Sequence, residues 1–160
     1  MGPPEPLSPI QPHQVDATAV LWCAGWRLGH AEIVPKALLQ FRNEAQFRDR
    51  ILASLPDCFV LADQDAIAGF VRLKGAELDQ FYIAPDRVGG GFAARLMAAA
   101  EELLRGRGQS EVHLIAAFGN DRAIRFYEKM GWRNCGSRIE GVETEVGPFE
   151  MTVVRFEKRL

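Results

Sequence analysis

Cysteine is scarce in this sequence, and the three cysteines, Cys23, Cys58 and Cys135, lie far apart. They form no Cys-x-x-Cys pair and no cluster with histidine, so the sequence shows no metal-binding pattern. An odd number of scattered cysteines also gives no complete disulfide framework. We therefore expect small buried apolar side chains in a reducing compartment, with neither a metal nor a disulfide bond.

Long apolar runs and blocks of one charge are also missing. No apolar stretch approaches the roughly 20 residues of a membrane-spanning helix, and the proline-rich N-terminus lacks the basic and apolar regions of a signal peptide. The 19 Lys and Arg residues nearly balance 21 Asp and Glu residues, which disfavours a nucleic-acid binder that neutralises phosphates. The composition predicts a cytoplasmic protein that binds neither nucleic acid nor a membrane.

The remaining composition is that of an ordinary globular chain, with 48% hydrophobic and 25% charged residues among 160. At about 150 residues per domain, this length predicts one domain over residues 1–160. Five of the nine prolines lie within residues 1–13. We therefore expect residues 1–6 to be flexible, with a short edge strand within residues 7–10.

Hydrophobic spacing predicts alternating groups of helices and strands. A helix is expected from an N-cap at Asp16 to about Gly29, followed by a looser segment from Pro35. A second helix with apolar positions from Phe41 onward should end before Pro56. The remaining pattern predicts an antiparallel meander over 58–84, a helix over 92–105, a strand over 111–118, a helix over 121–130 and strands near 132–139 and 151–157. This order indicates a mixed α/β domain.

The segment Val88–Ala93 (VGGGFA) places three consecutive glycines between a strand and an amphipathic helix. The glycines allow free N–H groups of the helix N-terminus to approach an anion, and the helix dipole adds to the attraction. A phosphate or pyrophosphate is the expected guest, with Arg87 or Arg95 as further donors. The alternative is a tight turn without a ligand.

Two other phosphate-binding patterns are weaker. No Gly-Lys-Ser/Thr ends the loop, which excludes a P-loop nucleotide hydrolase or kinase. Gly89, Gly91 and Ala94 satisfy the loose Gly-x-Gly-x-x-Ala dinucleotide pattern. However, in a dinucleotide-binding unit the first glycine directly follows a buried parallel strand, whereas here the preceding strand carries carboxylates and ends several residues earlier. In addition, only about 40 residues remain after the next strand, which is too few for the six-stranded sheet of that fold.

Two segments resemble the GNAT superfamily of N-acetyltransferases. The run LDQFYIAPDRVGGGFAARLM (Leu78–Met97) resembles the family's acetyl-CoA-binding segment, and NDRAIRFYEKMGW (Asn120–Trp132) resembles its second signature. Their order and spacing, with the meander and helices before them, extend the resemblance from about Leu7 onward. It implies a GNAT-like acyl-CoA N-acyltransferase fold, with a central, mostly antiparallel twisted sheet of about six or seven strands flanked by about four helices.

The same resemblance implies acetyl-CoA as co-substrate. The family pattern Gln/Arg-x-x-Gly-x-Gly/Ala falls on Val88, Gly91 and Ala93 and departs at Val88, which has no polar side chain. Backbone N–H groups are still expected to bind the pyrophosphate. Asn120 matches the family asparagine that hydrogen-bonds the pantetheine arm, and a helix-capping asparagine is the alternative. The residues expected to bind acetyl-CoA are Phe81, Tyr82, Ile83, Val88, Gly89, Gly90, Gly91, Phe92, Ala93 and Asn120.

The resemblance also implies that the strand end at Phe81, Tyr82 and Ile83 pairs with the pantetheine arm, in a slot where this strand splays from its neighbour. An amine attacks a thioester only when it is unprotonated, and alkylamines have pKa values about three units above neutral pH. Glu77 resembles the general base of several GNAT enzymes, and Asp79 is a second candidate that would act through a water. Period-two alternation would place both on the face of Phe81 and Ile83.

Tyr127 matches the family tyrosine that protonates the departing CoA thiolate. Solvated strand carboxylates and a core tyrosine are the alternative interpretations of these three residues. The first two helices and the loop before the last strand would cover the acceptor. The candidate site for a cationic amine contains Trp26, His30, Glu32, Glu140, Glu143, Glu145 and Glu150, which would otherwise be core aromatics and a solvated acidic loop.

The sequence therefore predicts an N-acetyltransferase that transfers an acetyl group from acetyl-CoA to a primary amine by direct attack in a ternary complex. The acceptor would be a small molecule or a peptide, and the C-terminal strands would allow a homodimer. Neither a metal nor a cysteine nucleophile is required. A non-enzymatic acyl-CoA-binding or regulatory module and, less favoured, a dinucleotide-binding domain stay as alternatives.

Overall fold

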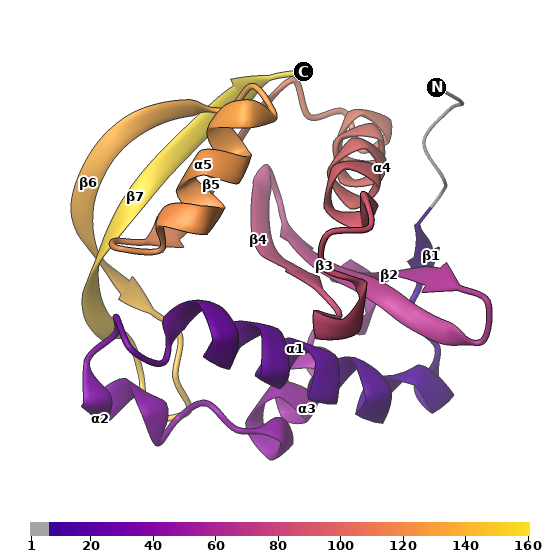
Figure 1. Ribbon diagram of the computed structural model, residues 1–160, viewed down its shortest axis with the longest axis horizontal. Coiled ribbons are helices and arrows are strands. Elements are labelled where there is room, and N and C mark those ends of the chain that lie inside the picture. The colour runs from indigo at the N-terminus through magenta and orange to yellow at the C-terminus, as the bar shows by residue number, and fades with distance from the viewer. Residues whose placement is uncertain (1–6) are drawn as a thin grey trace.

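The computed structural model describes residues 7–160, so the expected flexibility of residues 1–6 lies outside the described residues. Within that range the chain forms a seven-stranded sheet in the order β1-β2-β3-β4-β5-β7-β6 (Figure 1). The strands are β1 (Ser8–Pro9), β2 (Cys58–Asp63), β3 (Ala66–Lys74), β4 (Glu77–Ile83), β5 (Glu111–Ala117), β6 (Arg133–Val142) and β7 (Phe149–Arg159). All neighbouring pairs are antiparallel except β4 and β5. The expected mixed fold and short edge strand are confirmed.

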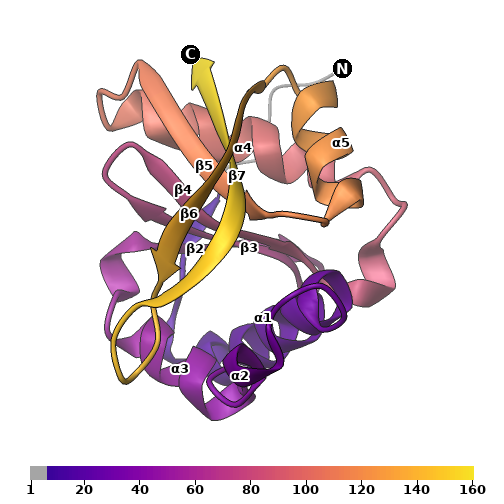
Figure 2. The same ribbon diagram turned by 90° about the vertical axis from the view of Figure 1, so that its left-hand side faces the viewer.

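Helices cover both faces of this sheet. They are α1 (Val15–His30), α2 (Lys36–Leu39), α3 (Glu44–Leu52), α4 (Phe92–Gly106) and α5 (Asp121–Lys129). Figure 2 shows α1, α2 and α3 below the sheet and α4 and α5 above it. One buried cluster joins α1 and α3 to the sheet through Trp22, Phe47 and Phe70, and the other joins α4 and α5 to the opposite face.

The N-terminal helices differ from the sequence prediction in their boundaries. The predicted N-cap at Asp16 is wrong: α1 begins at Val15, and Asp16 lies in the first turn, where its carboxylate pairs with Arg48. The second predicted helix begins only at Glu44, because the Asn43 side chain accepts a hydrogen bond from the N–H of Gln46 and caps it. The looser segment after Pro35 contains the one-turn helix α2.

The sheet opens between β4 and β5. These strands are parallel and pair only at Glu77 and His113, with one further backbone hydrogen bond from His113 N–H to Ala76 O at 3.2 Å. No β5 residue pairs with Gln80–Ile83, so the edge of β4 is released from its neighbour there. The splayed slot expected from the family resemblance is confirmed.

A β-bulge lies just before this opening. Arg72 pairs with Gln80, whereas the next β3 residue, Leu73, pairs with Leu78, so Asp79 has no partner on β3. The bulge reverses the alternation of side chains along β4. Leu78 therefore shares a face with Phe81. The prediction that Glu77 and Asp79 lie on the face of Phe81 and Ile83 is wrong: Glu77 is on the face of Tyr82, and Asp79 stands at the bulge, where its carboxylate binds Arg72.

No helix within residues 7–160 is long and apolar enough to cross a membrane. In the same range no group of three or more His, Cys, Asp or Glu side chains could hold a metal ion. Cys23 and Cys58 are buried as free thiols, whereas Cys135 is partly exposed.

Candidate active site

A cavity of about 330 Å³ occupies the opening between β4 and β5. Its lining comes from the helices α1, α2, α3 and α5, from the strands β3, β4 and β5, and from the β6–β7 hairpin. The structure brings together six of the residues predicted to act in catalysis or to bind acetyl-CoA, namely Glu77, Asp79, Phe81, Tyr82, Asn120 and Tyr127. The divergence of β4 and β5 thus creates the cavity in which the predicted catalytic and binding residues meet.

Glu77 stands at the start of β4, at the closed end of the opening. Burial raises the pKa of its carboxyl group, and the nearby negative charge of Asp79 raises it further, whereas Lys74 lowers it. A carboxylate with a raised pKa is a stronger base than an exposed glutamate. The environment of Glu77 is therefore suited to accepting a proton.

Asp79, the second candidate base, is held in a buried ion pair. Its Oδ2 accepts a hydrogen bond from Nε of Arg72 at 2.7 Å, and the two side chains are only 17% and 7% exposed. The same oxygen lies 3.3 Å from the amide nitrogen of Gln80. Because Arg72 is otherwise a buried charge, the clearest task of Asp79 in the fold is to compensate it.

Tyr127 reaches the cavity from α5. Its ring packs between Phe81, Phe126 and Phe156, at centroid distances of 6.3, 5.6 and 5.5 Å. Burial raises the pKa of the phenol above its ordinary value, so the hydroxyl is protonated at neutral pH. Among residues 7–160 this hydroxyl has no hydrogen-bond partner, which leaves its proton available to a ligand.

The glycine loop lies at the N-terminus of α4, outside the lining of this cavity. Gly89 and Gly91 have φ values of +88° and +81°, and a Cβ at either position would meet no atom within 4 Å. The N–H groups of Gly91, Phe92 and Ala93 donate to no acceptor in the described chain. The loop thus offers an open cradle with three unpaired donors at a helix N-terminus.

The side chains around the loop depart from expectation. Arg87 donates to Asp63 and Asp86, both at 2.8 Å, so its charge is already paired. The guanidinium of Arg95 lies over the ring of Phe92 at 4.7 Å, and Val88 is partly exposed. The preceding strand β4 is antiparallel to β3, which is unlike the buried parallel strand of a dinucleotide-binding unit.

The other predicted binding residues separate into two groups. Phe81 packs on Phe126 at 5.6 Å, and Ile83 belongs to the same hydrophobic cluster and does not line the cavity. Tyr82 packs on the opposite face, 6.4 Å from Trp22. Asn120 lines the cavity and also caps α5, since its Oδ1 accepts from the N–H of Ala123 at 3.4 Å.

The cavity contains only part of the acceptor site that the sequence suggested. Trp26, His30, Glu140 and Glu143 line it, whereas Glu32, Glu145 and Glu150 do not. Two arginines that the sequence did not single out, Arg42 and Arg50, line it as well. Their signal in the sequence was absent, because arginines within and beside a short polar helix look like solvent-facing residues.

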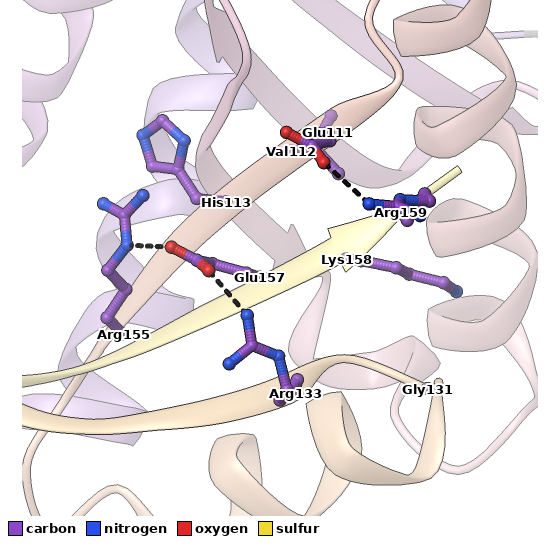
Figure 3. Close-up of a pocket in the computed structure, with 9 residues that line it drawn as sticks. All are labelled: Glu111, Val112, His113, Gly131, Arg133, Arg155, Glu157, Lys158 and Arg159. Atoms are coloured by element: carbon purple, nitrogen blue, oxygen red, sulfur yellow. Dashed lines mark hydrogen bonds and ion pairs between the residues drawn. The ribbon is translucent and has the colours of Figure 1, made fainter.

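A second hollow of about 660 Å³ runs along β5, β7 and the start of β6 (Figure 3). Its charged groups are paired: Arg159 with Glu111 at 3.1 Å, Glu157 with both Arg155 and Arg133 at 2.8 Å, and Lys158 with Glu101, outside the lining, at 2.9 Å. No buried side-chain polar atom of its lining in the described chain lacks a partner. We therefore place the candidate active site in the opening between β4 and β5.

Comparison with known proteins agrees with this geometry. A GCN5-related N-acetyltransferase structure from Rhodopseudomonas palustris shares 25% identity, covers 100% of this chain and 98% of its own, and superposes with a TM-score of 0.76. The PaiA N-acetyltransferase of Thermoplasma acidophilum, in complex with coenzyme A, is 15% identical over 96% of this chain and 98% of its own (TM-score 0.67). The spermidine N-acetyltransferase of Vibrio cholerae, in complex with CoA and spermine, is 19% identical over 96% and 94% (TM-score 0.68).

No curated protein sequence matches the chain. The family model described as the acetyltransferase (GNAT) family matches residues 27–132, which include both segments that carry the sequence resemblance and most of the cavity lining. The chain belongs to the GNAT family of acetyltransferases.

Proposed function

We propose that this acetyltransferase transfers an acetyl group from acetyl-CoA to a primary amine by direct attack in a ternary complex. The observation that carries the proposal is the convergence of Glu77 and Tyr127 on one cavity at the divergence of β4 and β5. One side chain is suited to accept a proton and the other to donate one. The reaction needs both, because the amine loses a proton and the CoA sulfur gains one.

The residues at the opening fit acetyl-CoA. The unpaired N–H groups of Gly91, Phe92 and Ala93 form a cradle for the pyrophosphate at the N-terminus of α4. The unpaired edge of β4 at Phe81–Ile83 offers backbone groups to the pantetheine arm. Two fold neighbours, PaiA and spermidine N-acetyltransferase, were solved with CoA. When bound, acetyl-CoA supplies the activated acetyl thioester.

Each catalytic residue has one task in this proposal. Glu77 accepts the proton that the amine loses, directly or through a water, as the new C–N bond forms. Tyr127 donates its hydroxyl proton to the CoA sulfur as the C–S bond breaks. Asp79 holds Arg72 in place beside the cavity and touches neither reacting atom.

The first test is a thermal-shift titration of the purified protein with acetyl-CoA, CoA and NAD. A ligand at 100 times its dissociation constant should stabilise the fold by about 2.7 kcal/mol. We expect a shift with both CoA species and none with NAD. A shift with NAD alone would refute the assignment of the loop.

Release of free thiol from acetyl-CoA in the presence of an amine library then tests catalysis. Binding of acetyl-CoA without acetylation of any amine would favour the non-enzymatic acyl-CoA-binding module. The loop is tested with the variant Gly91→Glu, and Gly106→Ala is its control. Gly106 lies at the other end of α4 from the cradle, and a Cβ there meets no atom within 4 Å.

A further inference from the structure

Three arginines come together around Glu143 at one end of the cavity, and two of them, Arg42 and Arg50, line it. Arg42 precedes α3, Arg50 lies on α3, and Arg72 lies on β3. All three approach Glu143: Nη2 of Arg72 donates to its Oε2 at 3.0 Å, Nη2 of Arg50 lies 3.7 Å from the same oxygen, and Nη2 of Arg42 donates to its backbone O at 2.7 Å.

The three guanidinium groups also lie over an aromatic floor, the indole rings of Trp22 and Trp26. Arg50 lies over the ring of Trp22 at 4.6 Å, and Arg72 over the same ring at 5.7 Å. Arg42 lies 5.7 Å from the centroid of Trp26. This floor fixes the positions of the guanidinium groups and removes water from one side of each.

The three arginines differ in the hydrogen-bond acceptors available to them. Arg72 has two carboxylate partners, Asp79 and Glu143. Arg42 is 4% exposed and donates only to backbone oxygens, and Arg50, whose side chain is 14% exposed, has no hydrogen-bond partner in the described chain. The Nε atoms of both Arg42 and Arg50 are buried without an acceptor.

The local charge is therefore unbalanced. The buried guanidinium groups of Arg42 and Arg72 and the half-buried one of Arg50 share two carboxylates, and one of these, Glu143, is 56% exposed. Burial, together with the positive charges of Arg42 and Arg72, lowers the pKa of Arg50 to about 10, a value at which it stays protonated at neutral pH. A buried donor without an acceptor is costly, so an anion that reaches this end of the cavity would bind favourably.

Arg42 and Arg50 share the cavity with the residues of the proposed chemistry. Glu77, Tyr82 and Tyr127 line the same cavity as these two arginines. The fork of a guanidinium matches a carboxylate in shape and hydrogen-bonding pattern.

We propose that the acceptor is a small amine that also carries a carboxylate, bound with its amine toward Glu77 and its carboxylate on Arg42 and Arg50. This inference rests on the proposed function of the same cavity. It replaces the expectation of a purely cationic acceptor, because a polyamine would bring further positive charge to three arginines.

Matched pairs of acceptors test the inference. Amino acids are compared with their amides and their decarboxylated amines, and with spermidine, using thiol release from acetyl-CoA as the readout. Thermal shifts of the CoA-loaded protein with the same compounds give a second, activity-independent readout. We expect the carboxylate-bearing member of at least one pair to have kcat/KM about 10- to 100-fold higher, the factor typical of a charged hydrogen bond, and to be the only member that stabilises the loaded protein.

Variants of Arg50 then test whether this arginine binds the carboxylate of the acceptor. Arg50→Gln should raise KM for the carboxylate-bearing acceptor about 10- to 100-fold, leave its amide unaffected and leave acetyl-CoA binding unchanged. Arg50→Lys keeps the positive charge but loses the forked guanidinium, so its KM for the carboxylate-bearing acceptor should lie between those of the unchanged protein and Arg50→Gln. Arg48→Gln, on the same helix but half exposed and paired with Asp16, should change nothing.

The two proposals fail in different ways. Absence of any shift with acetyl-CoA would overturn the function itself. If acetyl-CoA binds but amides, decarboxylated amines or spermidine are preferred, or if no carboxylate-bearing compound is either acetylated faster or more stabilising than its amide, the carboxylate site is overturned and the acetyltransferase proposal stands.

Discussion

Replacing each of the two candidate bases by its amide should separate catalysis from stability. Glu77→Gln removes a carboxylate whose pKa is raised in the folded protein. A raised folded-state pKa means that the group stabilises the fold below its unfolded pKa and that this contribution is lost as the pH rises through the folded pKa. At pH 7.5 the amide should therefore leave the free energy of unfolding unchanged or slightly increased.

Asp79→Asn should have the opposite effect on stability. The Asp79 carboxylate pairs at 2.7 Å with Arg72, whose side chain is 7% exposed. Removing one partner of a buried pair costs about 3–5 kcal/mol, and the lower end applies here because Arg72 keeps Glu143 and the asparagine oxygen still accepts a hydrogen bond. At about 2–4 °C per kcal/mol for a domain of this size, the melting temperature should fall by roughly 6–12 °C.

Thermal unfolding of the ligand-free proteins at pH 7.5, followed by circular dichroism, measures both effects. Turnover with acetyl-CoA completes the comparison: Glu77→Gln should lose about 10²–10⁴ in kcat at an unchanged melting temperature. Equal destabilisation by the two amides would remove the argument for Glu77 as base. An unchanged melting temperature for Asp79→Asn would show that the Arg72 pair does not hold this end of the cavity together.

Three further predictions address the proton donor, the loop and the pH dependence. Tyr127→Phe should lower kcat about 10²–10⁴-fold while acetyl-CoA affinity stays the same, and an unchanged kcat would exclude Tyr127 from the mechanism. Gly91→Glu should abolish acetyl-CoA binding in an isothermal titration, because it strains a residue at φ +81° and brings a negative charge to the cradle; normal affinity would refute the cradle. In the pH profile, kcat/KM should fall as Glu77 is protonated, with a midpoint above the ordinary glutamate value of about 4.3, and a midpoint at or below that value would contradict the role of burial.

The sequence by itself determined the order of the elements and the family. Alternating apolar residues predicted the meander, the glycines predicted a loop at the start of α4, and the Asn120–Trp132 segment predicted a helix over 121–130 that carries Tyr127. These features depend on local periodicity, turn chemistry and short motifs, which are written along the chain. For the same reason Gly89 and Gly91 have the positive φ values that only glycine adopts freely.

The sequence determined the boundaries of the N-terminal helices less well than the order of the elements. Asp16 and Asn43 are both good capping residues, and only Asn43 became a cap, because its side chain reaches the N–H of Gln46 while Asp16 pairs with Arg48. The choice depends on what packs nearby, since a capping bond is worth only about 1 kcal/mol.

Only the tertiary structure decided the faces and charges of the site. The bulge at Asp79 moved Glu77 to the face of Tyr82, and period-two alternation has no means of detecting one extra residue in a strand. The same bulge leaves Asp79 opposite no β3 residue, while its carboxylate pairs with Arg72. The arginine end of the cavity depends on contacts between residues as far apart as Arg42 and Glu143, so its excess of positive charge exists only once the chain has folded.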